Sequence, residues 1–201
     1  MTTPAKINFK VYQGSTFSEV LRWESPTKTY KNISAITQAA PMVISTTTAH
    51  GVPPNWRVKV TNVLGMTDIN STDNYQIVTE VTSTTLTINS INSLSYKTYV
   101  SGGVIEYNQP IDLAGYTGRM QIRSDIDSST VISELTTANG GVLIDNTLKT
   151  ITLNIPATTT AGFTFTTAVY DLELVSAGSQ VTQFCGGVIT CLLYTSDAAD
   201  E

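Results

Sequence analysis

The chain has 201 residues, of which 41% are hydrophobic and 13% are charged, and its formal net charge is −5. It is too apolar and too weakly charged for disorder, and its 11 Lys and Arg residues form no basic stripe, so we expect no nucleic-acid partner. No segment approaches the roughly 18 to 20 consecutive apolar residues of a membrane helix, and residues 1–14 lack the apolar core of a signal peptide. We therefore expect no membrane association.

Three residue types narrow the fold class and the chemistry. Threonine makes up about a sixth of the chain and, with Val, Ile and Tyr, predicts β-structure because branched side chains suit a pleated strand. The single histidine, His50, restricts any Ser-His-Asp or Cys-His site to one position. Cys185 and Cys191 are too few for a disulfide framework or a zinc site. We expect an all-β protein that is not an enzyme and has no catalytic, cofactor-binding or metal-binding residues.

The N-terminal segment alternates apolar and polar residues. Ile7, Phe9 and Val11 alternate with polar neighbours, and after a turn at residues 13–15 the alternation resumes over residues 17–23. A period of two predicts strands with one buried face. We expect the second strand to end at Pro26, because proline has no N–H to donate to a sheet.

A different pattern occupies residues 33–107. It contains five short strand candidates, separated by turns rich in Gly, Pro, Asn and Asp, at residues 41–46, 57–63, 75–81, 84–89 and 103–107. Many short strands with this punctuation are typical of a sandwich or a barrel. A segment of this length predicts a small β-barrel with a modest core.

From Pro110 the first pattern returns. Strands are expected at residues 117–123, 131–135, 142–144, 150–155, 168–175 and 181–190, with one helical turn at residues 156–161 that has Pro156 at its start. We predict a discontinuous β-sandwich domain of residues 1–32 and 108–190, interrupted by an inserted barrel of residues 33–107. Insertion at a hairpin tip is tolerated because the host strands keep their pairing.

Several stretches of the sandwich segment resemble small tailed-phage and prophage structural proteins. The matches are Trp23, the stretch PIDLAGYTGRMQIR at residues 110–123, the stretch GGVLID at residues 140–145, TITLNIPA at residues 150–157, YDLEL at residues 170–174 and GVIT at residues 187–190. The resemblance covers residues 6–32 and 108–190. It implies an immunoglobulin-like β-sandwich of the virion with no assigned enzyme activity.

The middle segment is similar to a second kind of module. The marks are Ala49-His50-Gly51, Gly65-Met66 with Asn70, the strand that begins at Tyr75, and residues 99–103 (YVSGG). They resemble the FCCH domain of ubiquitin-activating enzymes, a small β-barrel that recurs in phage tail and structural proteins. Ubiquitin chemistry is not implied, because the segment has no cysteine and no ATP-binding loop. The resemblance therefore implies a fold and not an activity.

The last eleven residues, 191–201 (CLLYTSDAADE), break the pattern of the final strand. They resemble translated adapter read-through at the ends of metagenomic reading frames. We expect a non-native tail here and a true C-terminal sequence that differs after Thr190. The alternative is a genuine short tail, and no function is inferred from these residues.

Polar residues that resemble catalytic or metal sites have simpler interpretations. His50 lies between a strand and a glycine turn, where capping the turn is favoured over catalysis. Asp125 and Asp127 provide too few oxygens for Ca²⁺, which takes six to eight ligands, so a solvated hairpin tip is favoured. Asp171 and Glu173 share one strand face, whereas a glycosidase pair faces across a cleft, so we place both carboxylates on the solvent face.

Three residues are candidates for an interaction surface. Arg119 and Arg123 flank apolar Met120 and Ile122 on an outward strand face, where a guanidinium suits bidentate pairing with carboxylates of a neighbouring subunit. A solvated surface is the alternative for both. Trp56 follows two prolines and is expected to be partly exposed, where an aromatic ring serves carbohydrate or protein contact.

These observations lead to one expected function and two alternatives. We expect a non-enzymatic virion structural protein of the tail or head–tail region, assembled in the host cytoplasm. Its partners are expected to be other phage structural proteins and further copies of itself in a homo-oligomer. The main alternative is a host-surface adhesin that binds a glycan. An enzyme such as a glycan hydrolase would need a carboxylate pair across a cleft.

Overall fold

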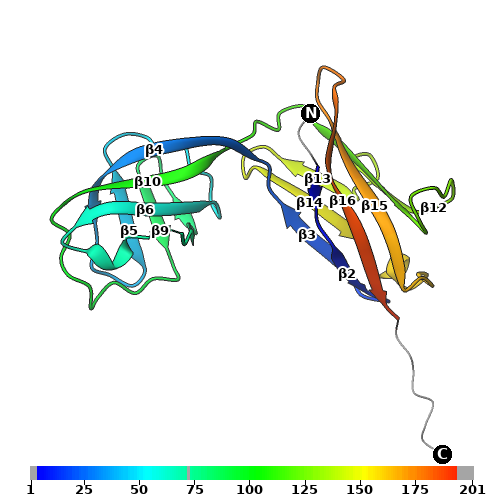
Figure 1. Cartoon of the computed structure of the whole chain (residues 1–201), viewed down its shortest axis with the longest axis horizontal. Coiled ribbons are helices and arrows are strands. Elements are labelled where there is room, and N and C mark those ends of the chain that lie inside the picture. The colour runs from blue at the N-terminus through cyan, green and yellow to red at the C-terminus, as the bar shows by residue number, and fades with distance from the viewer. Residues whose placement is uncertain (1–3, 72, 194–201) are drawn as a thin grey trace, which may run out of the picture. The chain divides into compact units, whose positions relative to one another are not determined.

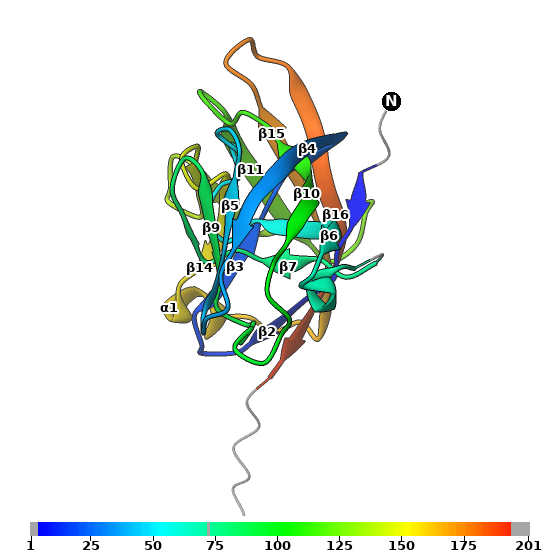
Figure 2. The same ribbon diagram turned by 90° about the vertical axis from the view of Figure 1, so that its left-hand side faces the viewer.

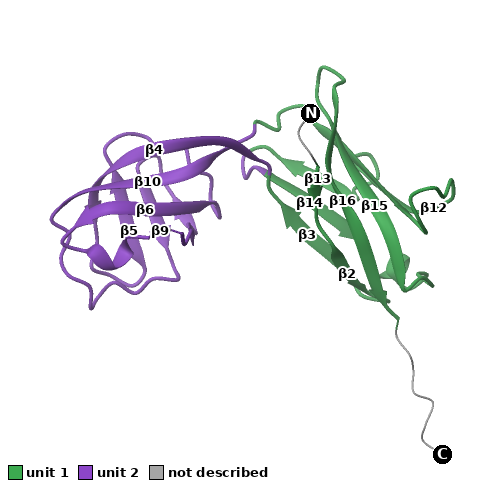
Figure 3. Cartoon of the chain, viewed as in Figure 1, with its two compact units in different colours: residues 1–22, 112–146, 150–201 green, residues 23–111, 147–149 purple. Residues whose placement is uncertain are grey.

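The structure is a computed structural model that describes residues 4–71 and 73–193 (Figure 1). Strands make up 52% of the described residues and helices 4%, so the predicted all-β fold class is confirmed. The chain divides into two compact units (Figure 3). Unit 1 consists of the chain up to Arg22, Asp112–Asn146 and the chain from Thr150 onward, and unit 2 consists of Trp23–Ile111 and Thr147–Lys149.

Unit 1 is a sandwich of two sheets. Within the described residues, the larger sheet has six strands in the order β1-β16-β15-β11-β12, with β2 also paired to β16, and the smaller sheet has the order β13-β14-β3. The strands of the larger sheet are β1 (Ala5–Lys6), β2 (Phe9–Tyr12), β11 (Thr117–Arg123), β12 (Val131–Thr136), β15 (Thr167–Val175) and β16 (Val181–Leu192). Those of the smaller sheet are β3 (Phe17–Leu21), β13 (Val142–Asp145) and β14 (Thr150–Ile155), and a single helical turn, α1 (Ala157–Thr160), follows β14 as predicted.

Aromatic contacts join the two sheets. The Phe9 ring on β2 stacks on Tyr170 of β15, with centroids 5.0 Å apart, and meets Phe17 of β3 edge-on at 5.5 Å. Around them the inward residues of β14 and β15, such as Leu153 and Leu172, are fully buried. Pairs of this geometry stabilise beyond their buried area. The Phe9–Phe17 pair therefore joins the two sheets, and Tyr170 supports Phe9 within the larger sheet.

The N-terminal strand is bound to the C-terminal strand. β1 and β2 both run parallel to β16, and the break between them at Ile7 and Asn8 is itself hydrogen-bonded. The Ile7 N–H donates to the Gly186 carbonyl at 3.1 Å, and the Asn8 Oδ1 accepts from the Val188 N–H at 3.0 Å. The Tyr170 hydroxyl donates to the Ile7 carbonyl at 2.9 Å. The N–H and carbonyl of Ile7 and the N–H of Val188 thus all have partners at this break.

Unit 2 is a curled sheet that closes on itself. Its strands are β4 (Glu24–Ile36), β5 (Met42–Thr46), β6 (Arg57–Leu64), β7 (Gln76–Ile77), β8 (Glu80–Val81), β9 (Thr85–Ile88) and β10 (Ser101–Pro110), with one 3-10 turn, η1 (Thr67–Ile69). Within the described residues the order is β7-β6-β10-β4-β5-β9-β8, and Figures 1 and 2 both show β4 and β10 side by side.

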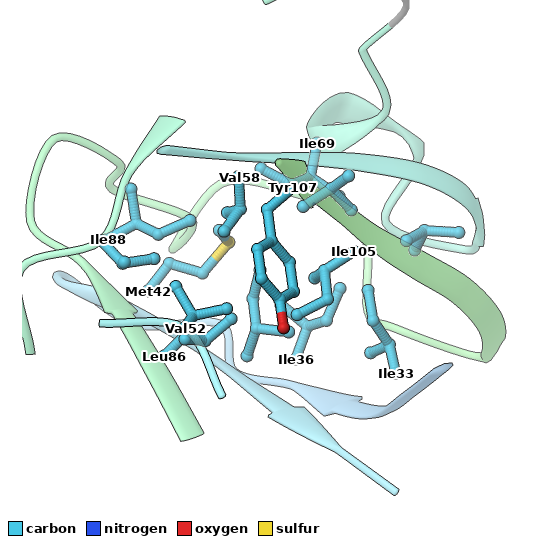
Figure 4. Close-up of a cluster of buried hydrophobic side chains, with 14 of the residues drawn as sticks. Ile33, Ile36, Met42, Val52, Val58, Ile69, Leu86, Ile88, Ile105 and Tyr107 are labelled. Atoms are coloured by element: carbon cyan, nitrogen blue, oxygen red, sulfur yellow. The ribbon is translucent and has the colours of Figure 1, made fainter. Parts of the chain in front are cut away.

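The two ends of this strand order belong to one segment, residues 76–81. The Val78 N–H donates to the Trp56 carbonyl at 2.9 Å beside β6, and the Thr79 N–H donates to the Thr87 carbonyl at 2.8 Å on β9. One extended segment therefore pairs with both edges of the sheet, which gives it a barrel-like form. The enclosed side chains include Met42, Leu86 and Ile105, all fully buried (Figure 4).

The structure corrects the expected boundaries between the sandwich and the insert. Residues 23–32 and 108–111 belong to unit 2 and not to the sandwich, because β4 runs without a break through Pro26 and pairs with β10. Pro26 is tolerated because it falls where the β4–β10 register shifts, while β5 pairs with β4 only from Ile33 to Ile36.

The structure also corrects part of the expectation for the C-terminal tail. Cys191 and Leu192 continue β16 and pair with Val11 and Tyr12 of β2. Cys191 is buried because it lies in phase with the buried Ile189 on the inner face. Residues 194–201 lie outside the described residues, and the origin of the tail stays a prediction. No helix in the described part of the chain is long and apolar enough to cross a bilayer.

We predict that Gly187→Ala loosens the N-terminal strand. A Cβ at this position would lie 2.0 Å from the Ile7 carbonyl oxygen, so the β1–β16 pairing must shift. Overpacking of this kind typically costs about 1–3 kcal/mol. The free energy of unfolding in urea should fall by this amount, with faster amide exchange in β1 and β2.

Gly178→Ala is the matched control, because a Cβ there would approach no atom closer than 3.8 Å. Equal stability of the two variants would contradict the tight contact between Gly187 and Ile7.

Candidate functional site

The outer face of the larger sheet in unit 1 is polar because its strands alternate. On β11, Met120 and Ile122 are fully buried, which leaves Arg119, Gln121 and Arg123 on the outer side. On β15, Leu172 and Leu174 are buried in the same way. We call the outer side the charged face, and it is made of Arg119, Gln121, Arg123, Glu134, Asp171, Glu173 and Gln183.

The strand register arranges these side chains in rows. Arg119 on β11 lies opposite Glu173 on β15, and Gln121 lies opposite Asp171. The third row continues with Arg123 opposite Val169. Residues that are directly opposite have Cβ atoms about 4.5–5.5 Å apart, so Arg119 stands beside the Glu173 carboxylate and Gln121 beside that of Asp171, while Arg123 stands beside Val169.

The first row holds an ion pair. Arg119 donates from Nε to the Glu173 Oε2 at 2.5 Å, and the two side chains are 57% and 29% exposed. An exposed pair contributes about 0–1 kcal/mol to stability. Its main effect is therefore to orient the two side chains.

The remaining polar side chains form a chain of hydrogen bonds. Arg123 donates to the Ser128 carbonyl at 2.6 Å and to the Gln121 Oε1 at 2.6 Å. Gln121 in turn donates to the Glu134 Oε1 at 2.8 Å. Binding costs conformational entropy for each side chain that it orders, so this network lowers that cost for a partner.

The charged face is also hollowed. A cavity of about 920 Å³ lies over it, lined at one edge of the sheet by residues 4–6 and at the other by Asp125 and Ile126 of the β11–β12 hairpin. Its floor includes the half-buried Val169 and Val188. Ile126 is 86% exposed. The face thus combines ordered charges with an apolar floor and an apolar rim.

Two of the three predicted interaction residues lie on this face. Arg119 and Arg123 point outward, as the alternation indicated, and Asp171 and Glu173 lie on the same outer side. Within the chain Arg119 pairs with Glu173, so a carboxylate stands beside it before any neighbouring subunit is considered.

The expectation for Trp56 is wrong. The side chain is fully buried in unit 2, and its Nε1–H donates to the Asn108 carbonyl at 2.9 Å. Trp56 lies in phase with Val58 and Val60, which are buried on the inner face of β6. That period of two was the signal in the sequence, and it outweighs the neighbouring prolines.

His50 caps a turn, as predicted. Its Nδ1 accepts from the Val52 N–H at 2.9 Å, and its Nε2 lies 3.2 Å from the Thr85 carbonyl, which assigns the proton to Nε2. Burial lowers the pKa of His50 below its ordinary value of 6.5, because the charged form loses its hydration. The Tyr107 hydroxyl donates to the His50 carbonyl, which fixes the turn to the core.

The other candidate chemical groups have local structural roles. Asp125 accepts from the Asp127 N–H at 2.9 Å, which forms the expected hairpin tip, and the described residues contain no cluster of His, Cys, Asp and Glu that could hold a metal ion. Both thiols are free and buried, and burial raises the pKa of Cys185 to about 11. Cys185 and Cys191 lie six positions apart on one strand, about 20 Å, which is too far for a disulfide.

The sequence was compared with protein families and with curated proteins. No family model matches it, and no curated protein matches it.

We predict that Trp56→Ala destabilises unit 2. Removing a buried aromatic side chain typically costs about 3–5 kcal/mol, and the Asn108 carbonyl loses its donor. Urea unfolding followed by Trp and Tyr fluorescence measures the change. Tyr30→Ala, which truncates a side chain that is 58% exposed, serves as the control and should change stability by less than about 1 kcal/mol. A Trp56 variant as stable as wild type would contradict the burial.

We predict that His50 makes the stability depend on pH between about pH 7.5 and 5.5. Because the folded-state pKa lies below 6.5, the unfolded chain binds more protons in this window. The contribution of His50 to stability is complete well above pH 6.5 and is lost as the pH falls through 6.5 toward the folded-state pKa.

Thermal unfolding at several pH values measures this dependence. His50→Asn is the matched control, since its Oδ1 can accept from the Val52 N–H without titrating. The variant should lose the slope, and a slope equal to that of wild type would show that another group causes it.

Proposed function

We propose that this chain is a non-enzymatic structural protein of a tailed-bacteriophage virion, in the tail or head–tail region. It acts through protein–protein contacts made by the charged face of unit 1. The observation that carries the proposal is that separate stretches of the phage-like pattern meet on this face. The stretch at residues 110–123 ends in β11, the stretch at residues 170–174 lies in β15, and the stretch at residues 187–190 lies in β16.

These strands are neighbours in the order β16-β15-β11. Residues that are far apart in the chain therefore combine into one surface. Three adjacent strands with outward Arg, Gln, Asp and Glu side chains provide directed hydrogen bonds over a broad area. Arginine is enriched in protein interfaces, where its planar group binds carboxylates at two points.

The conformation of this surface supports contact with a protein. The hydrogen bonds among Arg123, Gln121 and Glu134 hold the side chains in place before binding. The half-buried Val169 and Val188 supply apolar area at the floor of the cavity. Interfaces typically combine polar side chains with apolar area, as this face does. For the glycan-binding alternative, burial of Trp56 removes the aromatic residue on which it was based.

Mass spectrometry of purified particles from the source sample tests this proposal. Cleavage after Lys and Arg yields peptides 98–119 and 124–149, and the second of these lies mostly in unit 1. We expect both peptides at a fixed ratio to the major capsid protein. Their absence from clean particles would overturn the virion assignment, and binding of the recombinant chain to host glycans would favour the adhesin.

A further inference from the structure

We propose that the charged face binds the charged face of a second copy of this chain, about a two-fold axis that is parallel to the strands and lies between β11 and β15. This inference rests on the proposed function only in that the same face makes the assembly contact. Three features of the face bear on this pairing: the arrangement of its charges, the apolar hairpin tip and its size.

The charges are sorted by strand. The outer face of β11 carries Arg119 and Arg123, and that of β15 carries Asp171 and Glu173. A two-fold axis between these strands places β11 of each copy over β15 of the other and preserves the row. Since Arg119 and Glu173 share a row, Arg119 of each copy faces the partner's Glu173. Gln121 likewise faces the partner's Asp171.

The groups that meet in this way have capacity for further bonds. Arg119 donates to Glu173 from Nε, and a guanidinium has four more N–H groups on its two Nη atoms. A carboxylate accepts at about four positions. Each Glu173 can therefore accept from its own Arg119 and from that of the partner, which yields a closed cluster of two Arg and two Glu side chains.

The exposed hairpin tip fits the hollow of the opposite face. Ile126 rises at the β12 side of the cavity, beyond the row that holds Arg123, while Val169 and Val188 form the floor on the β15–β16 side. The same two-fold axis carries the β12 side of one copy over the β16 side of the other. Because this axis preserves the row, Arg123 of each copy lies over the partner's Val169, and Ile126, which is beyond that row, lies past it at the end of the partner's hollow next to Val188. This contact buries an isoleucine that is otherwise 86% exposed.

The size of the face predicts a weak dimer. Five strands spaced about 4.8 Å apart and paired over some 20 Å of length offer roughly 400–500 Å² on each copy. The total is below the 1,200–2,000 Å² of typical stable complexes. Closed two-fold pairing is the commonest form of self-association. We expect a dimer that depends on concentration and dissociates as salt screens the charges.

Charge reversal separates contacts between copies from contacts within one copy. One variant carries Arg119→Glu and Arg123→Glu, and the other carries Asp171→Lys and Glu173→Lys. Within each variant the facing strands have like charges, so each should be monomeric in sedimentation velocity. In a one-to-one mixture the acidic β11 faces the basic β15, and the Arg side chains of the second variant face the carboxylates of the first.

A heterodimer should therefore form in the mixture although the pairs within each chain remain broken. Lys31→Glu with Lys97→Glu is the control, because both lysines belong to unit 2 and lie outside the charged face, and the net charge changes as in the Arg variant. This control should dimerise like wild type at about 0.02 M NaCl and dissociate like it at about 0.5 M NaCl.

The hairpin contact has its own variant for the case that a charge-reversed chain folds poorly. Ile126→Asp should abolish the dimer, whereas Leu94→Asp, at a side chain that is 63% exposed in unit 2, should leave it intact. Any one of three results would overturn the pairing. These are a wild type that stays monomeric at low salt, a mixture that does not form the heterodimer, and an Ile126→Asp variant that still dimerises. If the wild-type chain is monomeric but is found in particles, only the pairing is overturned. If it forms the dimer but is absent from particles, only the virion assignment is overturned.

Discussion

The register between β11 and β15 is the constraint on which the charged face depends. Burial of Met120 and Ile122 against Leu172 and Leu174 fixes which residues of the two strands lie opposite each other. A slip of one residue would move every apolar side chain of a strand to the solvent side. The same core contacts therefore place Arg119 beside Glu173 without any need for that ion pair to be strong. In this sheet the buried apolar side chains set the strand register, and the register in turn places the polar side chains on the outer face.

Unit 2 depends on a different constraint, which is the satisfaction of buried polar groups. Trp56, His50 and Tyr107 are each buried, and each has a polar atom that bonds to backbone. A buried donor without a partner costs about 1–3 kcal/mol, so these side chains act together with the loop carbonyls that they contact. Glu106 shows the same logic on the outer side of β10. Its neighbour Lys28 is the main cause that lowers the pKa of Glu106, by a hydrogen bond of 2.5 Å.

Much of the fold could be predicted from local periodicity, since most of the strands expected in the chain occur in the structure within a few residues. The outward position of Arg119 and Arg123 followed from the same period of two. Trp56 was missed because the adjacent prolines were given more weight than its phase with Val58. The predicted strand end at Pro26 is wrong because tolerance of proline depends on whether a neighbouring strand needs its N–H, which is a property of pairing and not of local sequence. The ordering of Gln121 against Glu134 likewise required knowledge of which strands are neighbours.

Selectivity of the charged face follows from how weak its individual contacts are. An exposed pair such as Arg119–Glu173 contributes little to stability, so evolution can alter it without unfolding the sandwich. Opposed like charges, in contrast, cost enough to exclude a partner in the wrong register. A face with cations on β11 and anions on β15 therefore accepts a partner that places carboxylates over β11 and cations over β15. It rejects a partner that places cations over β11 and carboxylates over β15. The apolar floor at Val169 and Val188 adds area without direction, which leaves the choice of partner to the order of the charges.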